Sequence, residues 1–107
     1  MTREQATDLA MNYENLAVAK LSAANRLDTM YVSLKDMERR LDQSRIMNQV
    51  WSVIQGSGSM ATIEALERQV ASYRESVARM SADLAKAEEA CSNAYGELQA
   101  AARQLSR

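Results

Sequence analysis

The chain has 107 residues, of which 13 are basic and 14 acidic, so its formal net charge is −1. This near balance excludes a bulk electrostatic attraction to nucleic acid, to an anionic membrane or to a basic partner. The length accommodates one domain or one long hairpin, and we treat residues 1–107 as a single domain.

The residue types that are missing restrict the fold and the chemistry. The sequence has no proline and only three glycines, so it lacks the usual turn residues of many-stranded folds. It also has no histidine, the commonest general base and metal ligand, and a single cysteine, Cys91. We therefore expect no catalytic residue, no metal site, no cofactor and no enzymatic activity. The lone thiol favours a cytoplasmic location.

The first predicted element is a helix over about residues 3–54, rich in good helix formers. Thr2 followed by Gln5 fits a capping box at its start. Apolar residues recur every seven positions, with a second set offset by four, which predicts a coiled-coil seam. The two sets are Leu9, Leu16, Ala23, Met30 and Met37, and Tyr13, Leu27, Leu34 and Leu41. Lys20 and Asn48 are polar interruptions, which we expect to fix the register.

The apolar face of this helix is wider than contact with a single helix requires. Val18, Leu21 and Val32 lie off the seam. We therefore expect that two hairpins associate into a helical bundle, or that a partner protein supplies further helices.

A basic cluster lies in the second half of the first helix, interleaved with acidic residues. Its members are Lys35, Arg39, Arg40 and Arg45. Ion pairs three or four positions apart explain this pattern at least as well as contacts to phosphate or to an acidic partner.

The end of the first helix carries the most suggestive group. Six of the nine residues from 46 to 54 are large and apolar, and they include the only tryptophan. They span more than one helix face, as expected of a docking surface for another protein, although an oligomer could equally cover them. The predicted interaction residues are Ile46, Met47, Val50, Trp51 and Ile54.

A turn is predicted at 55–59, because the alternating Gly and Ser residues from 56 to 59 cannot hold a helix. The second predicted helix covers about residues 60–106, with Ser59 or Thr62 as its N-cap. Its heptads run without a break, which predicts a coiled coil. The core positions are Ile63, Val70, Val77, Leu84, Cys91, Leu98 and Leu105, and Leu66, Tyr73, Met80, Ala87, Ala94 and Ala101.

Folding the chain back at this turn brings the two seams together antiparallel. The numbers of facing residues would then sum to about 115 to 118, since short loops join antiparallel neighbours. On that register Ala101 lies near Tyr13 and Leu16.

The sequence therefore predicts an all-α fold, a long antiparallel helical hairpin of coiled-coil type that self-associates into a bundle. The leading function is a non-enzymatic protein-interaction module: an adaptor, assembly chaperone or small inhibitor, of the kind that phages and bacteria encode. One alternative is a structural subunit of a filament or scaffold. A less favoured one is an oligomeric nucleic-acid-binding protein. The expected partner is a protein or a second copy, not nucleic acid or a membrane.

Overall fold

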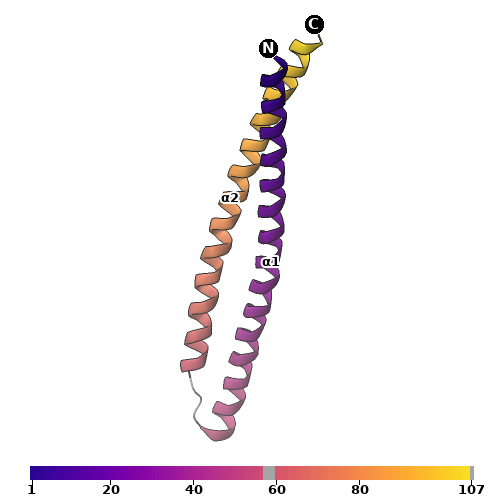
Figure 1. Cartoon of the computed structure of the whole chain (residues 1–107). Helices are drawn as coiled ribbons and strands as arrows, with labels where there is room; N and C mark the ends of the chain where they lie inside the picture. Colours follow the sequence, from indigo (N-terminus) through magenta and orange to yellow (C-terminus); the bar gives the residue numbers. More distant parts are fainter. Residues whose placement is uncertain (57–59, 107) are drawn as a thin grey trace. The chain divides into compact units, whose positions relative to one another are not determined.

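The computed structural model describes residues 1–56 and 60–106. They form two helices, α1 (Arg3–Gln55) and α2 (Ala61–Leu105), and no strand occurs within these ranges (Figure 1). The all-α prediction is confirmed, and the two helices form a helical hairpin.

Two compact units make up the chain, and both helices contribute to each of them. The turn unit comprises Asp28–Arg79, and the terminal unit comprises Met1–Leu27 together with α2 from Met80 onward. The prediction of a single domain over residues 1–107 stays a prediction.

The start of α1 has the predicted capping box. The backbone N–H of Gln5 donates to Thr2 Oγ1 at 3.2 Å, and the N–H of Thr2 donates to Gln5 Oε1 at 2.9 Å. Two N–H groups that the helix leaves without partners are thereby satisfied.

The end of α1 is set by Gly56. Its φ of 72° lies in the left-handed region, and its N–H donates to the carbonyl of Ser52 at 2.9 Å. This is a helix C-cap in which glycine adopts a conformation that costs other residues roughly 1–2 kcal/mol.

The two described glycines give a matched test of this cap. Gly56→Ala should lower the free energy of unfolding by about 1 kcal/mol, because of its positive φ. Gly96→Ala should raise it by about 0.5–1 kcal/mol, because alanine is the better residue inside a helix. A methyl group would meet no atom within 4 Å at either position, so packing does not confuse the comparison. Thermal denaturation followed by circular dichroism measures both, and equal shifts in the same direction would contradict the cap.

The start of α2 differs from one of the two predicted possibilities. The helix begins at Ala61, and the N–H of Glu64 donates to the carbonyl of Met60 at 2.9 Å. Thr62 therefore lies inside the first turn and is not the N-cap. Ser59 and the 57–59 part of the predicted turn lie outside the described residues.

The core of the turn unit consists of aliphatic side chains that recur every seven residues in both helices. Leu34 and Leu41 are buried on α1, and Ile63, Val70 and Val77 are buried on α2. Burial at this spacing confirms which face of each helix meets the other.

The terminal unit has a core of smaller side chains. Its buried residues are Leu27, Cys91, Ala94 and Ala101. Alanine at repeated contact positions lets helix backbones approach closely, as interdigitated packing requires. Beside them, the rings of Tyr13 and Tyr95 pack with their centroids 5.6 Å apart.

The predicted pairing of residues across the hairpin is wrong by about one to two helical turns. Two ion pairs between helices, Arg45 with Glu67 and Arg74 with Glu38, each join residues whose numbers add to 112. In the terminal unit the ring of Tyr13 packs on the ring of Tyr95, and these residue numbers add to 108. The prediction centred the hairpin on the Gly/Ser segment, but α1 continues past the first residue of α2. At the turn end the side chain of Asn48 contacts that of Met60, the residue before α2, so the end of α1 projects beyond the start of α2 (Figure 1).

Candidate protein-interaction surface

The most exposed group of large apolar side chains in the turn unit lies at the end of α1. We call it the tip cluster: Ile46, Met47, Val50, Trp51, Val53 and Ile54. The exposed fraction of these side chains ranges from 45% for Trp51 to 88% for Val53. Contiguous exposed apolar patches larger than a few hundred Å² are uncommon on monomeric proteins.

The helix geometry explains why α2 does not cover this cluster. Leu34 and Leu41 are buried against α2, and seven residues further along the same line of the helix lies Asn48, which is half-buried. Its side-chain amide donates to Met60 Sδ at 3.5 Å. The arc of the tip cluster is centred roughly 140° around the helix from the line through Leu34, Leu41 and Asn48. Its exposure therefore follows from a rotation of the apolar face as well as from the projecting last turn.

The surroundings of the tip cluster are uncharged. The sequence contains no Asp, Glu, Lys or Arg from residue 46 to residue 63. The nearest charge on α1, Arg45, is bound by Glu67 Oε1 at 3.1 Å and lies 3.6 Å from Asp42 Oδ1. Depletion of charge with enrichment in Trp and Met is the composition of the centre of protein–protein interfaces.

The basic cluster has carboxylate partners within the chain. Asp36 accepts from Arg39 at 2.6 Å and pairs with Arg40 at 3.0 Å, so one carboxylate serves two guanidinium groups. Lys35 is exposed and makes no ion pair among the described residues. Contacts of Lys35, Arg39, Arg40 and Arg45 to phosphate or to an acidic partner stay a prediction.

The two sides of the turn unit differ. One side carries a groove of about 340 Å³ whose walls include both ion pairs between the helices, Arg45 with Glu67 and Arg74 with Glu38. These exposed pairs contribute at most about 1 kcal/mol each, but they bridge the helices along that side.

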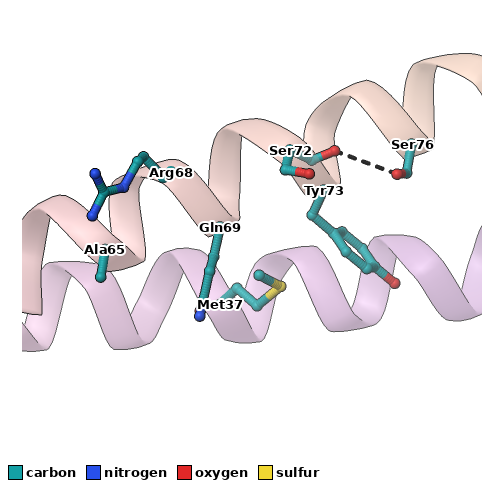
Figure 2. A pocket seen from close by; sticks show the side chains of 7 residues that line it. All are labelled: Met37, Ala65, Arg68, Gln69, Ser72, Tyr73 and Ser76. Atoms are coloured by element: carbon teal, nitrogen blue, oxygen red, sulfur yellow. Dashed lines mark hydrogen bonds between the residues drawn. The ribbon is translucent and has the colours of Figure 1, made fainter.

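The second groove, of about 560 Å³, is lined mainly by α2. Figure 2 shows Tyr73 and Gln69 extending from α2 toward α1, where Met37 lies, with Ala65 and Arg68 along α2. The Ser76 hydroxyl donates to the carbonyl of Ser72 at 3.3 Å, within the helix itself. Apart from Arg68, the side chains that line this groove are uncharged.

The remaining predicted features are placed as follows. Lys20 is exposed, and Cys91 is a buried free thiol. In the described ranges, no three His, Cys, Asp or Glu residues come together in a way that could hold a metal ion. Neither described helix combines the length and the hydropathy needed to cross a membrane.

One member of the tip cluster was not among the predicted interaction residues. Val53 is the most exposed of the six, yet the prediction named only the other five. Val32, Ile46 and Val53 are separated by seven or fourteen residues, so they lie on one line along α1, and all three are exposed. The seven-residue period that predicts the buried positions therefore also predicts that Val53 is exposed on the opposite part of the helix.

Comparisons of the chain with protein-family models, with curated proteins and with solved structures found no match.

Proposed function

We propose that this chain is a non-enzymatic protein-interaction module, an adaptor, assembly chaperone or small inhibitor that acts by binding another protein chain. The exposure of the tip cluster supports this proposal most directly, because the isolated hairpin gains no core from these six side chains. The heptad spacing of the buried residues further suggests that the paired helices form a coiled coil.

The size of the cluster sets the strength of the complex. Burying side chains of this kind contributes roughly 1.5–3 kcal/mol each when they start fully exposed. The six together, more than half exposed on average, therefore offer on the order of 5–10 kcal/mol. Association costs about 4–15 kcal/mol, so the cluster alone supports a weak or moderate complex.

A structural subunit of a filament or scaffold is the second candidate function. No side chain with less than 2% exposure is found among the described residues, so the core of the hairpin is thin. Small folds with thin cores are commonly completed by oligomerisation. The terminal unit also leaves Met11, Val18 and Leu21 exposed, and these side chains fit self-association into a helical bundle.

Photo-crosslinking at the tip tests the proposal. A photoreactive benzoylphenylalanine replaces Val53 in the full chain, and adducts formed in the producing cells are identified by mass spectrometry. The matched control carries the same residue at Val32, an exposed valine at an equivalent helical position in the same unit. We expect adducts with a different protein chain at position 53 and fewer at position 32. Adducts only with the chain itself would refute binding of a different protein through the tip and leave self-association, and none with any protein would contradict both.

A further inference from the structure

We infer that the tip cluster binds a second copy of this chain, tip to tip about a two-fold axis. This inference rests on the proposed function, in that both require the tip cluster to be a protein-binding surface. It adds that one bound chain is a second copy. Three observations support it: the tip carries no charge, the end of α1 projects beyond α2, and the exposed apolar area fits a weak dimer.

The charge of the surface favours a copy of itself. A two-fold interface brings the same patch of both chains together, so any charge in it meets its own sign. The 18 residues from 46 to 63 carry no charge, so two copies of the tip meet without electrostatic repulsion. Lipid is a poorer occupant, because amphipathic helices that bind membranes carry Lys and Arg on their polar face. Polar residues around this tip, such as Gln49 and Ser52, are neutral.

The projection of α1 makes the surface accessible to a copy. Asn48 contacts Met60, the residue before α2, so Val53 and Ile54 lie beyond the start of α2. A second α1 end can lie against them without contact with the charged part of the turn unit, which begins at Arg45 and Glu64.

The area is sufficient for a weak dimer. Each apolar side chain of this size presents roughly 60–120 Å² when fully exposed, so the six, which are more than half exposed on average, present on the order of 200–450 Å² per copy. A standard stable interface buries about 800 Å² per partner. The pair should therefore be weak and form reversibly as the concentration rises.

Mass and fluorescence, measured together, test where two chains meet. Sedimentation equilibrium over a hundredfold concentration range should show the mass rising from one chain to two. Trp51 is the only tryptophan and lies in the cluster, so its emission should move to shorter wavelength with the same midpoint. A single-chain mass at every concentration overturns the inference, and so does growth beyond two chains. A doubled mass without a change in Trp51 emission places the contact elsewhere and overturns it too.

A charge swap separates self-association from binding of a foreign protein. Val53→Asp and Val53→Lys should each weaken the dimer at least tenfold, because like charges then meet across the interface. A 1:1 mixture of the two variants should recover association, since opposite charges now face each other. Val32→Asp, the matched control, should dimerise like the unaltered chain. Val53 is almost fully exposed, so neither substitution should affect folding.

The outcomes distinguish this inference from the proposed function. If the mixture does not recover association, the two-fold contact is refuted. The proposed function would still stand if crosslinks at position 53 join the chain to a different protein. If crosslinks also fail at position 53, both are refuted.

Discussion

Leu34→Asp is expected to unfold the chain almost completely. Leu34 is 9% exposed in the core of the turn unit, so the change removes a buried leucine and places a carboxylate there without a partner. Truncating a buried leucine alone costs about 2–5 kcal/mol, and the buried charge adds to it. Since domains of this size are stable by about 5–15 kcal/mol, circular dichroism should show most of the helix signal lost.

Val32→Asp is the control for this substitution. Val32 lies two residues away on the same helix and is 70% exposed. Each variant places an aspartate four residues before an acidic side chain, Asp36 or Glu38, so helix propensity and local repulsion are closely matched. Melting temperatures within a few degrees of each other would refute the assignment of Leu34 to the face that meets α2.

Ile63→Ala should have the second largest effect. Ile63 is 3% exposed at the start of α2, and deleting a buried isoleucine to alanine costs about 2–5 kcal/mol. Ile54→Ala is the same chemical change at a side chain that is 67% exposed in the tip cluster. It should alter the free energy of unfolding by no more than about 0.5 kcal/mol.

Urea denaturation measures both isoleucine variants, at a concentration low enough to keep the chain monomeric. A large loss for Ile54→Ala under these conditions would mean that the tip cluster belongs to the core of the hairpin. It would then not be an interaction surface.

Features that depend on neighbours in sequence could be predicted well. The capping box of Thr2 and Gln5 is set within four residues, and the buried line through Val70 and Val77 follows from a seven-residue period. The face that each helix turns toward the other is therefore determined by local spacing.

The pairing across the hairpin could not be predicted in the same way. It depends on how far α1 continues before it ends at Gly56, and on where α2 begins at Ala61. A shift by one whole helical turn leaves the same faces in contact, so the heptad pattern fits more than one register. Only contacts between the helices, such as Arg45 with Glu67, select one of them.

The tip cluster could be predicted only in part, because its exposure also depends on how the two helices overlap. Composition alone identified the region around Trp51, but whether its side chains are covered depends on the overlap of the two helices. The predicted overlap placed α2 opposite these residues, whereas the structure leaves the last turn of α1 without a helix level with it.

The last turn of α1, which ends at the cap formed by Gly56, should be locally less stable than the core of the hairpin. Its amide protons are held by hydrogen bonds within α1 and by the cap, with no packing from α2 level with them. Such a segment opens at a free energy well below that of global unfolding, so its amides exchange with solvent water ahead of those in the core. A chain that binds the tip would order this turn, and slower exchange there would report binding even where the structure of the core does not change.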